Sequence, residues 1–333
     1  MVGGPRHPVI DPKACVHGRS VLAGCADCIP ACPHGALRFE RGFVRLDADA
    51  CQGCGACAGA CPVRAIRQEP PPPEPVRDGA ALILVCARHP AATGRLAPAC
   101  IQGAGLEQVA EWALSGVTRI ACATGDCGTC PDAPAQRLAG TLDDLAPLAR
   151  AAGLTPPRAA PASRTQIALW TRRAGDGPAP ARRALLKALT APLRDSAGQP
   201  PALARLQARM PEDAPRAFVP RIDPALCSGC DACIRLCPES ALTLINDRAD
   251  GLRYRITPHA CTGCLLCEDV CTDSAIQVGA MKVPAPDIAL TRLDCRACGA
   301  TVHVPRSGPY ASGGLCPVCA ASGHHKKLFQ VLT

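Results

Sequence analysis

A cysteine repeat with the spacing Cys-x2-Cys-x2-Cys-x3-Cys dominates this chain of 333 residues, 25 of which are cysteine. Complete copies begin at Cys51, Cys227 and Cys261, and a copy with an altered start spans Cys25 to Cys32. The copies form two pairs, since the last two begin 34 residues apart and the first two match at an offset of 29 residues. Three cysteines at two-residue intervals lie on one tight loop, so we expect their sulfurs to converge on an inorganic centre.

The repeat resembles that of bacterial two-cluster ferredoxins, in which the fourth cysteine of each motif ligates the other cluster of the pair. The resemblance implies a [4Fe-4S] cluster on each of four ligand sets: Cys227, Cys230, Cys233 and Cys271; Cys261, Cys264, Cys267 and Cys237; Cys51, Cys54, Cys57 and Cys32; and Cys25, Cys28 and Cys61 with Cys15 as the candidate fourth ligand. Zinc at all of these thiols is the alternative, although structural zinc sites favour isolated Cys-x2-Cys pairs. We also expect a short hairpin between the motifs of each pair, over 36–46 and 241–256.

Cys15 departs from the ferredoxin pattern because nine residues separate it from Cys25, where the family has two. A loop over Val16 to Gly24 must therefore fold out and return, and its glycines and serine favour such a loop. A three-iron cluster, or His17 as the ligand, is the alternative. A second departure is Thr272, which replaces the proline that follows the fourth cysteine elsewhere. We expect little effect from it, because the proline shapes a turn and supplies no ligand.

A proline run, Pro70 to Pro73, predicts a stiff spacer after the first pair of motifs. Beyond it, apolar strands are expected over 81–85 and 117–121 with a helix over 105–114 between them, which together form a parallel βαβ unit. The strand ends and loops of this unit carry five cysteines. In this respect the segment is similar to the delta-type electron-transferring subunits of hydrogenases. That resemblance implies a [2Fe-2S] cluster, for which the candidate ligands are Cys86, Cys100, Cys122 and Cys127, with Cys130 as the fifth thiol.

Two alternatives apply to this middle segment. The cysteines can be small core residues at strand ends, since cysteine is among the most buried residue types. The loop Thr124 to Asp126 can instead meet a ligand at a switch point of the sheet. No Gly-x-Gly-x-x-Gly sequence is present there, so a dinucleotide site has little support.

The last part of the chain combines a linker with a second kind of cysteine pattern. Residues 155–218 are rich in Pro, Ala and Arg and predict a linker with one helix, over Ala181 to Leu193. Near the C-terminus, two Cys-x2-Cys pairs are separated by seventeen residues, which is the spacing of a zinc ribbon. We expect one Zn²⁺ ion, with a rubredoxin-like iron as the alternative, on Cys295, Cys298, Cys316 and Cys319.

The formal net charge of +8 invites an anionic partner such as nucleic acid. Each [4Fe-4S] cluster with its four thiolates carries about two negative charges, however, so four clusters offset that charge. The first ten residues lack the basic and apolar pattern of a signal peptide, and no segment reaches 18 apolar residues. We therefore expect a cytoplasmic protein without a transmembrane segment, and nucleic acid is not an expected partner.

These patterns together predict an α+β multidomain protein in which two ferredoxin-like dicluster domains flank a small α/β insert. The expected boundaries are 1–69 for the first dicluster domain, 70–79 for the proline-rich linker, 80–154 for the insert, 155–218 for the second linker, 219–282 for the second dicluster domain, and 283–333 for a zinc-ribbon-like C-terminal domain.

This domain order is similar to that of cytoplasmic polyferredoxins that accompany molybdenum enzymes such as formate dehydrogenases. The chain shows no catalytic triad, paired catalytic carboxylates or phosphate-binding loop. The resemblance therefore implies an electron carrier without its own small-molecule substrate, which passes single electrons to or from a larger dehydrogenase or hydrogenase. The alternatives are an accessory factor that binds an apo-oxidoreductase during its maturation, and a zinc-ribbon nucleic-acid binder.

Overall fold

The structure is a computed structural model that describes residues 7–68, 75–92, 100–134, 138–175, 200–247 and 251–323. Its contacts divide the chain into two compact units. The first contains Met1–Cys15 and Ala26–Pro211, and the second contains Val16–Cys25 and Glu212–Thr333. The expected spacer at Pro70 to Pro73 and the expected helix over Ala181 to Leu193 lie outside the described residues.

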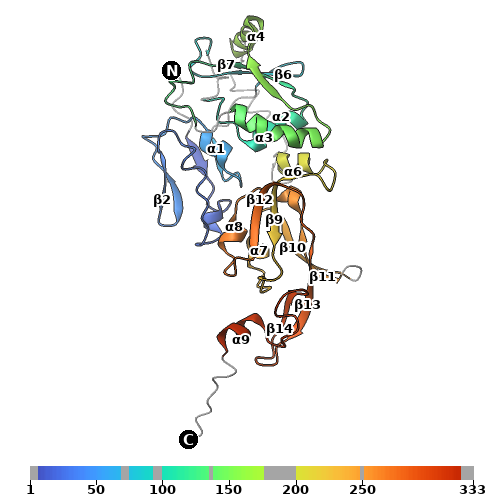
Figure 1. The fold of residues 1–333 in the computed structure, drawn as a ribbon. Helices are drawn as coiled ribbons and strands as arrows, with labels where there is room; N and C mark the ends of the chain where they lie inside the picture. Colours follow the sequence, from blue (N-terminus) through green and yellow to red (C-terminus); the bar gives the residue numbers. More distant parts are fainter. Residues whose placement is uncertain are drawn as a thin grey trace, which may run out of the picture. The chain divides into compact units, whose positions relative to one another are not determined.

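Each unit contains the same strand arrangement around its pair of cysteine motifs (Figure 1). The strand before the first motif pairs with the strand after the second motif, and the two strands between the motifs form an antiparallel hairpin. In the first unit these strands are β1 (Pro8–Ile10) with β4 (Ile66–Gln68), and β2 (Leu37–Glu40) with β3 (Phe43–Leu46). In the second unit they are β9 (Arg216–Ile222) with β12 (Ile276–Lys282), and β10 (Leu242–Asp247) with β11 (Gly251–Ile256). Both expected hairpins are therefore present.

The turn of the first hairpin shows why these residues reverse the chain. Glu40 pairs with Phe43, so only Arg41 and Gly42 form the turn, and both have positive φ, at 52° and 81°. Two central residues with positive φ give the turn type whose twist matches that of the flanking strands.

Short helices begin next to the third cysteine of each complete motif. They are α1 (Ala56–Ala60), α7 (Ala232–Leu236) and α8 (Leu266–Asp269), and two 3-10 turns accompany them, η1 (Val16–Gly18) and η3 (Pro258–Ala260).

The middle of the first unit is a four-stranded sheet with the order β5-β6-β7-β8. Its strands are β5 (Val76–Asp78), β6 (Ala81–Val85), β7 (Arg119–Ala123) and β8 (Arg158–Pro161). The sheet carries α2 (Leu106–Leu114) and α3 (Leu138–Ala151) as its connecting helices. β6 and β7 pair in parallel, which is the arrangement expected of the βαβ unit. β7 starts two residues later than expected because Gly116, with φ 81°, ends α2 and the chain needs a turn there.

The range 155–218 differs from the linker expected there, because much of it is folded. β8 adds a parallel strand to the sheet, α4 (Arg164–Gly175) follows it, and α6 (Ala202–Gln207) and the start of β9 come later. Trp170 of α4 is only 1% exposed and packs with Ile83, Val85 and Ala123 of the sheet. One buried indole ring thus attaches a Pro-, Ala- and Arg-rich segment to the core, and composition alone did not reveal this.

Alanine in place of Trp170 is expected to lower the free energy of unfolding of the first unit by about 3–5 kcal/mol, because it leaves a cavity against the sheet. Chemical denaturation monitored by circular dichroism measures this. Arg173→Ala, at an exposed position of the same helix, is the control and should change stability by less than about 0.5 kcal/mol. Equal, small effects of both variants would show that α4 is not docked.

The chain after β12 extends the hairpin sheet of the second unit. β13 (Ile288–Asp294) pairs with β11 and with β14 (Thr301–Pro305), which gives the strand order β10-β11-β13-β14. The helix α9 (Pro317–Ser322) follows. Among the described residues, no helix is both long enough and apolar enough to cross a lipid bilayer.

Candidate metal centres

Two cavities in the second unit are each lined by four cysteines drawn from both of its motifs. One is lined by Cys237, Cys261, Cys264 and Cys267. The other is lined by Cys227, Cys230, Cys233 and Cys271. The last cysteine of each motif therefore lies with the first three of the other motif, in the sets that the ferredoxin resemblance implies.

The first unit contains a third cavity of the same kind. Its cysteines are Cys32, Cys51, Cys54 and Cys57. Cys32 again comes from the neighbouring motif. The imidazole of His34 also lines this cavity.

The backbone of each complete motif turns in the same way, which explains why the sulfurs converge. The residues immediately before and after the second cysteine have positive φ in all three motifs: Gly53 and Gly55, Gly229 and Asp231, and Gly263 and Leu265. Glycine adopts this conformation freely, whereas aspartate and leucine do so at a cost of about 1–3 kcal/mol each. Convergence of the thiols is thus built into the local backbone.

The fourth cysteine of each motif sits at a second recurring turn. The residue three positions later has positive φ, and the next backbone N–H donates to the cysteine sulfur at 3.2–3.4 Å, from Ala36 to Cys32, Ala65 to Cys61, Ala241 to Cys237 and Ala275 to Cys271. The turn at Cys271 forms although Thr272 replaces proline. The expectation that this replacement has little effect is confirmed for the geometry of the turn.

Burial raises the pKa of three of the thiols that line the cavities, those of Cys57, Cys233 and Cys261, to about 12. Backbone N–H groups oppose this effect at several of them, as that of Gly263 does at Cys261. Such thiols hold their protons at neutral pH, so metal binding must release protons, and the N–H groups then stabilise the sulfur charge.

The fourth predicted set is divided between the two units. Cys15, Cys28 and Cys61 belong to the first unit, and Cys15 lies near enough to Cys61 to contribute to its raised pKa, after the larger effect of burial. Cys25 belongs to the second unit, where its carbonyl oxygen lies 2.7 Å from Nε2 of His17. That contact engages one of the two ring nitrogens through which His17 could bind iron. The ligand role of Cys25 stays a prediction.

The five cysteines of the α/β part occupy different settings. Cys86 is buried at the end of β6, Cys122 lies within β7, and the other three lie in loops. Burial raises the pKa of Cys100 to about 11, and its sulfur accepts backbone N–H groups as the ferredoxin cysteines do. The sulfur of Cys127 accepts a hydrogen bond from the side-chain amide of Gln102 at 3.7 Å. The sulfur of Cys122 instead lies 3.7 Å from the carbonyl oxygen of Ile120 in the same strand, and this contact suits a protonated thiol that donates.

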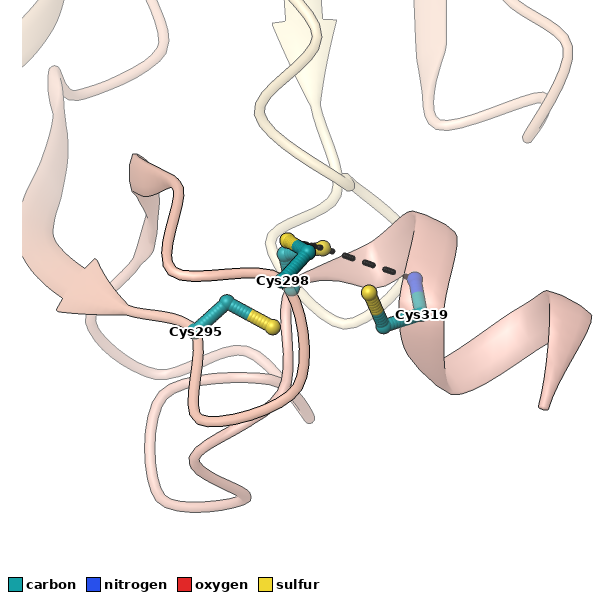
Figure 2. Close-up of side chains that lie close together, drawn as sticks. Cys295, Cys298 and Cys319 are labelled. Atoms are coloured by element: carbon teal, nitrogen blue, oxygen red, sulfur yellow. Dashed lines mark hydrogen bonds between the residues drawn. The ribbon is translucent and has the colours of Figure 1, made fainter. Parts of the chain in front are cut away.

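The four C-terminal cysteines form a tight group whose sulfurs all lie within 4.8 Å of one another. A tetrahedral site with metal–sulfur bonds of about 2.3 Å places sulfurs about 3.8 Å apart. The Sγ atoms of Cys298 and Cys316 are 3.9 Å apart. Figure 2 shows Cys295, Cys298 and Cys319 turned toward a common centre. The group therefore has the geometry of a site for a single ion.

Local structure supplies this geometry. Cys295 directly follows β13 and Cys298 lies in the turn before β14, while Cys316 caps α9 and accepts the N–H of Cys319 at 3.4 Å. Backbone N–H groups, foremost that of Cys316, lower the pKa of Cys295 to about 5, whereas burial raises the pKa of Cys319. The N–H groups thus favour the thiolate form of Cys295, which is the form that binds a metal ion.

Sequence reasoning missed one polar cluster beside the cavity of Cys227. The hydroxyl of Tyr254 donates to Oδ1 of Asp231 at 2.7 Å, and Nε2 of His303 lies 2.8 Å from the same oxygen. The two rings meet edge to face with centroids 5.8 Å apart. Since Asp231 adjoins Cys230 in the motif loop, the cluster links β11 and β14 to that loop. The spacing of 72 residues between Asp231 and His303 left no sequence signal.

Phenylalanine in place of Tyr254 is expected to lower the free energy of unfolding of the second unit by about 1–3 kcal/mol, because Asp231 loses a buried hydrogen bond. Thermal unfolding of the metal-loaded protein measures this. Tyr310→Phe is the control, since the Tyr310 hydroxyl makes no hydrogen bond within the described part of the chain. The cluster would have no structural role if the two variants unfolded alike.

Two segments match family profiles. Residues 44–67 match the 4Fe-4S binding domain, and residues 226–275 match the 4Fe-4S dicluster domain. These segments are ferredoxin-type iron-sulfur domains. The first match contains the Cys51 motif, and the second contains both motifs of the second unit. The comparison with curated proteins gives no match.

The family matches and the cysteine-lined cavities agree on the chemistry of the chain. The chain contains two iron-sulfur domains of the ferredoxin type, a kind of domain that transfers electrons, and a separate group of cysteines near its C-terminus has the geometry to bind a metal ion.

Proposed function

We propose that this protein is a polyferredoxin that passes single electrons through four [4Fe-4S] clusters, between a redox partner protein and a larger redox enzyme. The observation that carries the proposal is that three separate cavities are each lined by four cysteines, three from one motif and one from its neighbour. [4Fe-4S] clusters supply one-electron redox chemistry, and the surrounding burial and N–H groups tune their potentials. The exchanged fourth cysteines hold the two sites of each pair close together.

The ligands in this proposal are the cysteines of the three cavities, with a fourth site on Cys15, Cys25, Cys28 and Cys61. The C-terminal group holds one Zn²⁺ ion in a closed structural site. The α/β part holds a [2Fe-2S] cluster on four of its five cysteines. Because the sulfur of Cys122 faces a carbonyl oxygen, Cys130 is the better fourth ligand beside Cys86, Cys100 and Cys127.

Serine variants decide between the two candidate ligands. Cys130→Ser is expected to lose about two irons, because it removes a ligand of the two-iron cluster, whereas Cys122→Ser should keep the full iron content. Iron analysis after anaerobic purification measures both variants. Loss of about two irons in Cys122→Ser, with full iron content in Cys130→Ser, would show that Cys122 is the ligand.

The partner is a redox protein of the dehydrogenase or hydrogenase type. The order of the cysteine motifs resembles that of polyferredoxins of formate dehydrogenase systems, and this likeness favours a molybdenum enzyme as the electron acceptor or donor. A reducing compartment such as the cytoplasm suits a chain whose cysteines bind metals rather than form disulfides.

A redox titration with a candidate partner tests the function. We expect reversible reduction of the anaerobic protein by a low-potential donor, followed by reoxidation when a purified formate dehydrogenase uses the electrons to reduce carbon dioxide to formate. Stable binding to the apoenzyme without electron flow would instead establish a maturation factor. Salt-dependent binding to DNA would indicate a nucleic-acid binder.

A further inference from the structure

Within the first unit, the α/β part (75–175) and the first ferredoxin part (7–68) approach each other closely through backbone. The loop before α2 lies directly against α1. A Cβ atom added at Gly59 of α1 would overlap the carbonyl oxygen of Gly103, and one added at Gly105 would overlap that of Gly59. A Cβ at Gly103 would come within 3.0 Å of Cα of Ala56. Glycine at these positions permits an approach that any larger residue would prevent.

Polar side-chain contacts also join the same two parts. Asp132, in the loop after Cys130, lies 2.8 Å from Nε2 of His34 and 2.6 Å from Nη2 of Arg88. The side chains of Asp132 and His34 are only 13% and 19% exposed, whereas that of Arg88 is 52% exposed. Arg64 lies 3.9 Å from Glu107 of α2. The two parts are therefore held in one orientation.

This contact places cysteines of the two parts next to each other. Cys100 precedes the glycine loop, and Cys54 precedes α1. Cys54 lines the cavity of the first unit, and Ala56, two residues later, lies against Gly103, which comes three residues after Cys100. The loop that carries Cys100 therefore packs against the motif loop that carries Cys54.

We propose that the cysteine centre of the α/β part exchanges electrons directly with the [4Fe-4S] site of Cys32, Cys51, Cys54 and Cys57, across the contact between the glycine loop and α1. The inference rests on the proposed function, since both sites must carry clusters. One electron leaves one centre and arrives at the other, and no bond forms or breaks and no proton moves. The α/β part is then an entry or exit point for electrons.

Electron paramagnetic resonance of the reduced protein tests this route, because two neighbouring paramagnetic centres broaden each other's signals. We expect the signal of the two-iron centre to be broadened in the native protein. The broadening should disappear in Cys57→Ser, which removes the adjacent cluster, and persist in Cys264→Ser, which removes a cluster of the second unit. An equal effect of both variants, or none of either, would overturn the route.

A gentler variant covers the case in which Cys57→Ser does not fold. Gly59→Ala pushes the glycine loop away from α1, so we expect full iron content with weakened broadening. Gly140→Ala is the matched control, since Gly140 also lies in a helix, α3, and a Cβ there meets nothing within 4 Å. Unchanged broadening in Gly59→Ala would overturn the route. A protein with about sixteen irons and no two-iron signal would overturn it too while leaving conduction through four clusters intact, and a protein without iron would overturn both proposals.

Discussion

Serine in place of Cys237 is expected to remove about four irons, and the cluster lost is the one on Cys261, Cys264 and Cys267 rather than the one nearest in sequence. The reason is geometric. Cys237 lines the cavity of those three cysteines, although it lies only four residues after Cys233. Because binding of the cluster stabilises its surrounding fold, thermal stability of the second unit should fall as well.

Double variants reveal which cluster Cys237 serves. Adding Cys264→Ser to Cys237→Ser should remove no further iron, since both residues hold one cluster, whereas adding Cys230→Ser should raise the loss to about eight irons. Arg235→Ser, at an exposed position of α7 in the same motif, is the control and should keep all its iron. If the double variant with Cys237→Ser and Cys230→Ser lost only about four irons, Cys237 would be a ligand of the cluster held by its own motif.

Alanine in place of Cys316 is expected to release the C-terminal metal and unfold the segment around it. Cys316 is buried, caps α9, and lies 3.9 Å from the sulfur of Cys298. Binding of zinc to four such ligands contributes about 10–16 kcal/mol, far more than this small segment gains from its apolar contacts.

Zinc analysis and hydrogen exchange measure the effect. Cys316→Ala should contain no zinc, and its amides between Cys295 and Cys319 should exchange rapidly. Val318→Ala is the control, because Val318 lies between two of the ligands yet is 72% exposed. Native zinc content and slow exchange in Cys316→Ala would show that the fold here does not depend on the metal.

The cysteine sites were predictable from sequence because their geometry is local. The residues on either side of Cys54 and Cys264 form the same turn with positive φ, which brings the sulfurs of each motif together. The ferredoxin resemblance supplied the exchange of the fourth cysteine between the motifs of a pair. The structure places the predicted sets of Cys32, Cys237 and Cys271 in common cavities. Their role as ligands remains the proposal that the variants test.

Features that depend on distant residues were not predictable. β8 is a four-residue strand of unremarkable composition, and only its pairing with β7 and the burial of Trp170 make it part of the sheet. Likewise Tyr254, Asp231 and His303 are polar residues without a motif, and tertiary structure alone brings them together. The contact between Gly59 and Gly103 belongs to the same class.

The metal content of the anaerobically purified protein tests the account most directly. Four cubic clusters and one two-iron centre predict about eighteen irons and about eighteen labile sulfides per chain, together with one zinc ion. A brown protein with this content supports electron conduction. A colourless protein that holds only zinc and no labile sulfide would contradict it.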